Sequence, residues 1–125
     1  MKDTQRSWKG RLTGEGGGRS AQVDGYRDNL DFTECYDDLI KFSAAHGKPI
    51  AFSECGPSPW DGSPLDGSFD NRLYATQLKK CPKIAFFISW SSWFDKDTKV
   101  NMSLVDNMYA SELLNDPYII NMGDF

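Results

Sequence analysis

Two short apolar segments, each followed by a polar loop, constrain the fold of this 125-residue chain most strongly. The first covers residues 50–53 and ends at Glu54, and the second covers residues 84–90. Segments with the apolar spacing of helices precede both. Uninterrupted apolar runs of strand length are typical of strands that are buried on both faces, as in parallel sheets. We therefore predict an α/β fold with parallel strands and with ligand-binding loops at their carboxyl ends.

Capping and turn-forming residues set the helix boundaries. A first helix is predicted to start at Asp31, which would form a capping box with Glu34, and to stop at Gly47. A second helix is predicted over about residues 70–80 and a third over about residues 104–115. The order helix, strand, loop, helix, strand, loop, helix supports the parallel sheet.

The beginning of the chain and the loops differ from these elements in composition. Residues 1–22 are polar and rich in glycine, which predicts a flexible leader before a folded portion over residues 23–125. Residues 57–67 are dense in Pro, Gly, Ser and Asp, and residues 91–101 are polar, so we predict a loop in each place. Loops of this kind often carry function.

The charge pattern excludes some partners. The chain has 18 acidic and 14 basic residues, a net charge of −4, and no cluster of Lys and Arg beside aromatic residues. We therefore expect no nucleic-acid partner. No stretch of about 18 apolar residues is present, so no membrane span is expected. The N-terminal residues lack the apolar run of a signal peptide, and the sequence does not indicate a compartment.

Cysteine and histidine do not form a recognisable site. Cys35, Cys55 and Cys81 are an odd number without a paired short spacing, so neither a zinc site nor a closed disulfide framework is indicated, while one disulfide stays open. His46 falls at the predicted end of the first helix, where a cation would face the last carbonyl groups. We expect no metal and no cofactor.

Glu54 is the first candidate for a functional residue. A carboxylate at the end of an apolar strand is costly unless something at the sheet edge uses it. The alternative is an ordinary solvated glutamate, and the position alone does not decide between the two. Trp90 repeats the pattern one strand later, where an indole can support a sugar ring or fill the core.

Three ordered segments resemble glycoside hydrolase family 26, best known for endo-β-1,4-mannanases. They are KPIAFSECG (residues 48–56), KIAFFISWSSW (83–93) and NDPYIINMGDF (115–125), which are similar to the seventh strand, the eighth strand and the closing segment of that family. The most specific element is Lys-Pro, an apolar strand and then Ser-Glu-x-Gly. The resemblance covers about residues 23–125. It implies a partial (β/α)8 TIM barrel of about strands six to eight, since a complete barrel needs about 250 residues.

The resemblance also implies roles for single residues. Glu54 corresponds to the catalytic nucleophile, and Trp90 resembles the aromatic platform under the sugar, with Trp93 as the second choice. Tyr26, in VDGYRDN, is similar to a strand-six tyrosine that hydrogen-bonds the nucleophile, although a core or surface tyrosine is equally compatible. Retaining glycosidases need a second carboxyl group as the proton donor. The resemblance places that donor on strand four, which this chain does not contain.

The other acidic residues fit structural roles better. Glu34 suits a helix N-terminus, and Asp61 and Asp66 suit turns. Asp95 and Asp97 lie in the predicted loop after the second apolar segment, where they would border a groove or face solvent. None of these is a replacement for the missing donor.

Three functions remain open from the sequence. The leading one is a fragment of a hydrolase that cleaves β-1,4-mannosidic bonds in mannan-type polysaccharide and is incomplete without its N-terminal half. The second is a non-catalytic polysaccharide-binding module that uses Trp60, Trp90 and Trp93. The third is a related β-glucanase or xylanase. Full-length relatives are expected to be secreted, and the open sheet edges of a partial barrel predict marginal folding or self-association.

Overall fold

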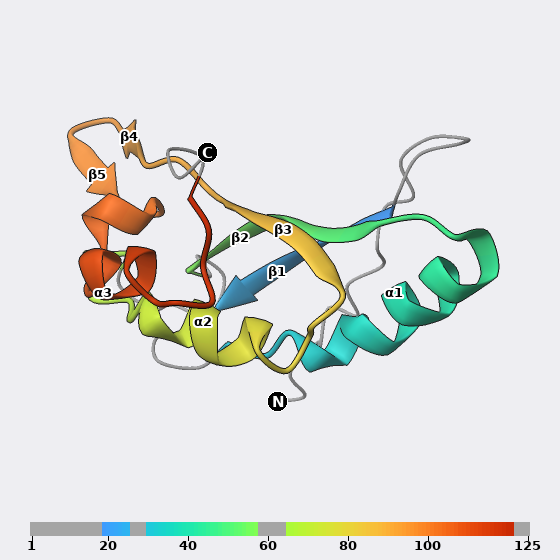
Figure 1. Cartoon of the computed structure of the whole chain (residues 1–125). Coiled ribbons are helices and arrows are strands. Elements are labelled where there is room, and N and C mark those ends of the chain that lie inside the picture. The colour runs from blue at the N-terminus through green and yellow to red at the C-terminus, as the bar shows by residue number, and fades with distance from the viewer. Residues whose placement is uncertain (1–18, 26–29, 58–64, 122–125) are drawn as a thin grey trace, which may run out of the picture.

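One parallel sheet organises the part of the chain that the structure describes. The computed structural model describes residues 19–25, 30–57 and 65–121. Its parallel sheet has the order β1-β2-β3 (Figure 1), formed by β1 (Arg19–Gly25), β2 (Ile50–Pro57) and β3 (Ile84–Ser89). Each strand is added on the same side of the previous one through a helical crossover. The predicted α/β fold with parallel strands is confirmed.

Helix α1 (Thr33–His46) has the start and stop signals that the sequence suggested. The Asp31 carboxylate accepts hydrogen bonds from the Thr33 backbone N–H at 2.8 Å and from the Thr33 hydroxyl at 2.6 Å. These two bonds lower the pKa of Asp31. At the other end, Gly47 adopts a left-handed φ of 60°. The side chain of Glu34 lies outside the described residues, so the reciprocal half of the capping box stays a prediction.

Helix α2 (Arg72–Leu78) packs on the same face of the sheet as α1 (Figure 1). Aromatic rings join the layers: the Phe32 and Phe52 centroids lie 4.3 Å apart, and the Tyr74 ring stacks on Phe87 at 5.2 Å. One core cluster unites both helices with the sheet and consists of Leu30, Phe32, Leu39, Ile50, Phe52, Cys55, Phe69, Tyr74, Ala75, Leu78, Cys81 and Leu113. Successive helices on one face are the pattern of a singly wound sheet.

The opposite face of the sheet is open where β3 lies. Phe87 packs toward the helices, whereas its neighbours Phe86 and Ile88 are 55% and 53% exposed. The sequence predicted a strand buried on both faces, and this is wrong for the described residues. Phe86 and Ile88 flank Phe87 on the strand, so alternation sends both of them to the open face, and no described layer covers it.

The predicted loop over residues 91–101 contains a short hairpin. Its strands β4 (Trp93–Asp95) and β5 (Thr98–Val100) are antiparallel, and Lys96 takes a φ of 54° in the turn. Both strands have three residues, and most of their side chains are exposed. Because so short a polar hairpin buries little, its sequence lacks the apolar alternation that identifies a strand.

The predicted helix over residues 104–115 is interrupted. The structure has a 3-10 helix η1 (Leu104–Asp106) and a short helix α3 (Ala110–Leu114). Between them Tyr109 adopts a φ of 60°, which a continuous right-handed helix does not allow. The Asn107 side chain also donates to two backbone carbonyls before α3, which competes with helix formation.

Two boundaries differ from the predictions. β1 begins at Arg19, so the last four residues of the predicted leader, residues 1–22, belong to the sheet, and residues 1–18 lie outside the described part. β2 continues to Pro57 instead of ending at Ser53. No described helix is long and apolar enough to cross a bilayer.

The open face predicts self-association of the chain. Replacing both Phe86 and Ile88 by Ser should lower the average mass at a given concentration, because the apolar contact area on this face is lost. Sedimentation velocity over a concentration series measures the effect. Val105→Ser is the control, since Val105 is an exposed apolar residue on η1 and lies outside the sheet. A mass that responds equally to both changes would contradict the prediction.

Two glycines form a matched pair for a stability test. Gly47 and Gly67 both have positive φ, but a Cβ on Gly47 meets nothing within 4 Å, whereas a Cβ on Gly67 would lie 2.6 Å from the Asp106 carbonyl oxygen. Gly47→Ala should cost about 1 kcal/mol of the free energy of unfolding, from backbone strain alone. Gly67→Ala should cost roughly 2–3 kcal/mol, because the clash adds to the strain. Urea unfolding measures both, and equal losses would contradict this account.

Candidate functional site

Glu54 lies inside β2, not at its end, and its direction depends on the strand register. Ile50 and Phe52 belong to the core on the helix side of the sheet. Side chains alternate along a strand, so a regular β2 would send Glu54 into the same apolar core. A carboxylate there would be strongly unfavourable.

An extra residue in β2 prevents this. Ala21 of β1 pairs with Phe52, and the next residue, Gln22, pairs with Glu54, so Ser53 has no counterpart on β1. The bulge restarts the alternation: Cys55 is fully buried in the helix-side core, and Glu54 is exposed. Glu54 therefore faces away from the helices, toward the open side of the sheet.

Trp90 continues the pairing of β3 with β2 beside this carboxylate. Its backbone N–H donates to the Cys55 carbonyl at 2.9 Å. A Cβ placed on Gly56 would lie 3.0 Å from Trp90 Cδ1 and 3.1 Å from the Met102 Cε atom, so a larger residue there would require one of these side chains to move. Gly56 comes two residues after Glu54 on one strand, about 6.6 Å along it. The indole thus packs on β2 next to the carboxylate and keeps 36% of its surface exposed.

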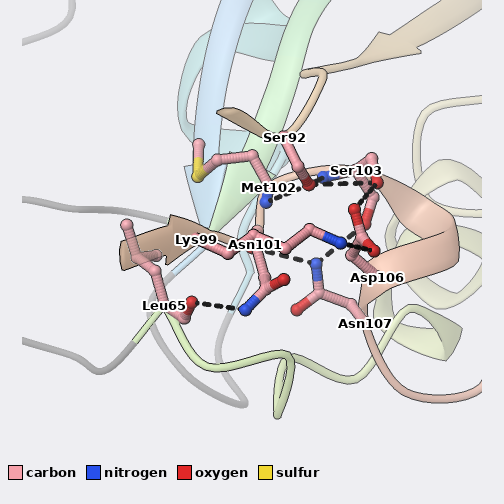
Figure 2. Close-up of polar contacts among 8 residues, drawn as sticks. All are labelled: Leu65, Ser92, Lys99, Asn101, Met102, Ser103, Asp106 and Asn107. Carbon is pink, nitrogen blue, oxygen red and sulfur yellow. Dashed lines mark hydrogen bonds and ion pairs between the residues drawn. The ribbon is translucent and has the colours of Figure 1, made fainter. Parts of the chain in front are cut away.

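Two residues after Trp90, the Ser92 hydroxyl holds the segment that follows the hairpin (Figure 2). It accepts hydrogen bonds from the backbone N–H groups of Met102 and Ser103, both at 3.0 Å. It also donates to the Ser103 hydroxyl at 3.1 Å. The side chain of Met102 is buried. Ser92 therefore fixes the residue that contacts the Gly56 position from the other side.

Asp106 completes this polar cluster. Its carboxylate accepts from the Ser103 hydroxyl at 2.8 Å and pairs with the Lys99 ammonium group (Figure 2). Lys99, then the hydroxyls of Ser92 and Ser103, lower the pKa of Asp106 to about 2. We call Ser92, Lys99, Ser103 and Asp106 the clasp. It joins the base of the hairpin to η1.

Asparagine side chains anchor the same region to neighbouring segments. Asn101 Nδ2 donates to the Leu65 carbonyl at 2.9 Å. Asn107 Nδ2 donates to the carbonyls of Asn101 and Ser103 at 3.1 and 2.8 Å, and its Oδ1 accepts from the Phe69 N–H. These amides lie on both sides of η1 in the sequence and add hydrogen bonds to backbone groups, so they hold an irregular segment in one conformation.

The structure brings together some of the predicted site residues. Glu54 lies in β2, and Trp90 directly follows the neighbouring strand β3. Trp93 begins the hairpin that follows Trp90, with 43% of its surface exposed. Tyr26 and Trp60 lie outside the described residues. Tyr26 directly follows β1 in the sequence. Its structure is not described, so its predicted hydrogen bond to Glu54 stays a prediction.

The remaining acidic residues behave as turn or surface residues where they are described. Asp66 Oδ1 accepts a hydrogen bond from the Ser68 N–H at 3.0 Å, as expected for a turn residue. Hydrogen bonds with the side chain and the backbone of Ser68 lower the pKa of Asp66. Asp95 and Asp97 are exposed on the hairpin, and Asp61 lies outside the described residues. Among the described residues, no hydrogen bond joins Glu54 to a second carboxylate.

The cysteines do not suggest nucleophilic catalysis. Cys35, Cys55 and Cys81 are present as thiols. Burial raises the pKa of the Cys81 thiol to about 11, which keeps it protonated at neutral pH. His46 ends α1 as predicted and lies 4.6 Å from the Phe42 ring. Over residues 19–25, 30–57 and 65–121, no cluster of His, Cys, Asp and Glu has the geometry of a metal site.

Sequence analysis missed the residues that support the site. Gly56 stands in the Ser-Glu-x-Gly motif, and its lack of a side chain was a signal for close approach of another group. Ser92, Met102 and Asp106 gave no signal, because their contacts cross the hairpin or an irregular segment and follow no helix or strand spacing.

Comparison with known proteins supports a relationship to one glycosidase. Over 103 residues, 82% of this chain, the sequence is 31% identical to the mannan endo-1,4-beta-mannosidase of Bacillus subtilis (strain 168). The aligned part is 24% of that enzyme, so the chain spans about a quarter of the length of the curated relative it matches. No protein-family model matches the chain, and no solved structure matches it at a significant level. The chain is thus a distant relative of a mannanase.

The clasp predicts a specific acid sensitivity. Because the folded-state pKa of Asp106 is about 2, below its ordinary value of 3.8, its contribution to stability is present above about pH 4 and is lost as the pH falls toward 2. Asp106→Asn should therefore flatten the pH dependence of the urea midpoint between pH 4 and 2. Asp38→Asn is the control, since Asp38 forms only an exposed 3.6 Å pair with Lys41. The same profile in both variants would contradict the role of the clasp.

Proposed function

We propose that this chain is the C-terminal part of a retaining glycoside hydrolase that acts on β-1,4-linked mannan, with Glu54 as its nucleophile. The observation that carries the proposal is the bulge at Ser53, which turns Glu54 out of the core to the open face beside Trp90. Bulges are frequent next to active sites, where they aim a side chain. The similarity to a mannan endo-1,4-beta-mannosidase supports mannan as the substrate class.

The topology supports a segment of a (β/α)8 barrel. In a doubly wound sheet the helices cover both faces, whereas a barrel keeps them all outside. Here α1 and α2 share one core on one face, and the strands follow in sequential order. The open face would then be the barrel interior, and its carboxyl edge would be the active-site end. The rest of the barrel would cover Phe86 and Ile88.

The mechanism assigns a limited set of roles to this chain. Glu54 would be ionised and attack the anomeric carbon, forming a glycosyl ester while the bond to the leaving oxygen breaks. Trp90 would support the sugar ring through its exposed surface. The proton for the leaving oxygen would come from a carboxylic acid about 5–5.5 Å from Glu54. That acid would belong to the preceding part of the barrel.

A non-catalytic binding module is the second candidate. Its support is the exposure of the indoles of Trp90 and Trp93, together with the absence of a second described carboxylate joined to Glu54. In this case Glu54 would only accept hydrogen bonds from the polysaccharide. A related glucan or xylan substrate is compatible with the same residues.

An activated substrate tests the nucleophile without the missing acid. A dinitrophenolate group leaves without protonation, so 2,4-dinitrophenyl 2-deoxy-2-fluoro-β-mannobioside should glycosylate Glu54 even in a half-site. Intact-mass spectrometry should show one adduct per chain, and peptide mapping should locate it on Glu54. Glu54→Gln should abolish labelling, because an amide is a far weaker nucleophile.

Glu112→Gln provides the matched control, since Glu112 is exposed on α3 and far along the chain from β2. It should label like the unmodified chain. Binding of β-mannan without any adduct, and unchanged by Glu54→Gln, would favour the binding module. An adduct on another residue would exclude Glu54 as the nucleophile.

A further inference from the structure

One residue of the clasp, Ser92, lies between the two exposed indoles of the candidate site in the sequence. Ser92 is two residues after Trp90 and immediately before Trp93. Its one hydroxyl group makes three hydrogen bonds, two from backbone N–H groups and one to Ser103. A single side chain therefore connects the segment with both indoles to residues 102 and 103.

The connection to Trp90 runs through Met102. The Met102 N–H is bound by Ser92 at 3.0 Å, and the Met102 side chain is buried with its Cε atom near the Gly56 position. Trp90 Cδ1 approaches the same position. Both side chains therefore approach one point on β2, and a movement of Met102 would open space near the indole.

The connection to Trp93 runs through the hairpin. The clasp closes the hairpin at its base, because Ser92 precedes β4 and Ser103 follows β5 by three residues. Trp93 pairs with Val100 in the first rung next to this base. The Asp106 carboxylate then ties the base to η1 through Ser103 and Lys99 (Figure 2). A three-residue exposed hairpin buries too little to hold this position alone.

We propose that Ser92 and Asp106 are positioning residues, which hold Trp90 and Trp93 in the orientation that receives the sugar beside Glu54. This inference rests on the proposed function. The hydroxyl of Ser92, the hydroxyl of Ser103 and the carboxylate of Asp106 form one directed series of hydrogen bonds. Such series strengthen each bond and favour one arrangement. Orientation of a binding group to within about 1 Å is what efficient catalysis requires.

The test is fluorine NMR of the whole chain labelled with 5-fluorotryptophan, with each signal assigned by a Trp→Phe variant. In Ser92→Ala the signals of Trp90 and Trp93 should shift and broaden. Ser92→Thr, which keeps the hydroxyl, should resemble the unmodified chain. Ser111→Ala is the matched control, because Ser111 is an exposed serine on α3. A role in stability alone would lower the melting temperature and leave the folded-state signals in place.

Ser103→Ala is the milder variant, because it removes the hydroxyl between Ser92 and Asp106 and leaves the two backbone N–H groups to donate to Ser92. It decides the question if Ser92→Ala does not fold. It should move the Trp93 signal in the same direction. Unchanged Trp90 and Trp93 signals in the folded variants would overturn the proposal.

A titration with β-1,4-mannohexaose separates this inference from the proposed function. The sugar should bind the unmodified chain and the Ser111→Ala control equally, and Ser92→Ala about tenfold more weakly. Equal binding by Ser92→Ala would overturn the positioning role and leave the proposed function intact. If the unmodified chain does not bind mannohexaose, sugar binding by this chain fails, and the fluorine signals still decide whether the clasp orients the indoles.

Discussion

The extra residue at Ser53 lets β2 direct its apolar side chains into the core and Glu54 to the opposite face. Before it, Ile50 and Phe52 point into the core between sheet and helices, and after it Cys55 resumes that direction. Glu54 is thereby left on the other side, in solvent. With strict alternation the same sequence would either bury a carboxylate or lose the core contacts of Phe52, and both are costly. The position of the candidate nucleophile therefore depends on strand register more than on any contact of its own side chain.

Helices consequently cover one face of the sheet, and no described element covers the other face where β3 lies. Phe32, Phe52, Tyr74 and Phe87 pack ring to ring and close the helix side. The face that carries Glu54 and Trp90 also exposes apolar residues of β3. A retaining glycosidase needs such an arrangement only when another part of the chain supplies the opposing wall and the acid. The exposed apolar residues from which we predict self-association are thus also what one side of a barrel interior would present.

Local signals explain which elements could be predicted. Helix α1 was predictable because its apolar spacing, Asp31 and Gly47 all point to one element, and the parallel strands were predictable because apolar runs alternate with helices. The bulge, the hairpin and the break at Tyr109 were not predictable. Each depends on pairing with distant residues or on a backbone conformation that no local pattern requires. The sequence indicated Glu54 as a candidate residue, but it did not predict the bulge that turns this side chain out of the core.

The polar network between the hairpin and η1 also combines residues that stand out in the sequence with residues that do not. Trp90 and Trp93 are conspicuous in the sequence, but their orientation depends on Ser92, Met102 and Asp106, which are ordinary residues in a polar segment. An exposed indole on a short hairpin can rotate, and a rotating platform binds a sugar ring weakly because its freedom must be lost on binding. The four polar side chains of the clasp would remove this freedom before the sugar binds. This gives a reason for their presence, since a simple loop could also have connected β3 to α3.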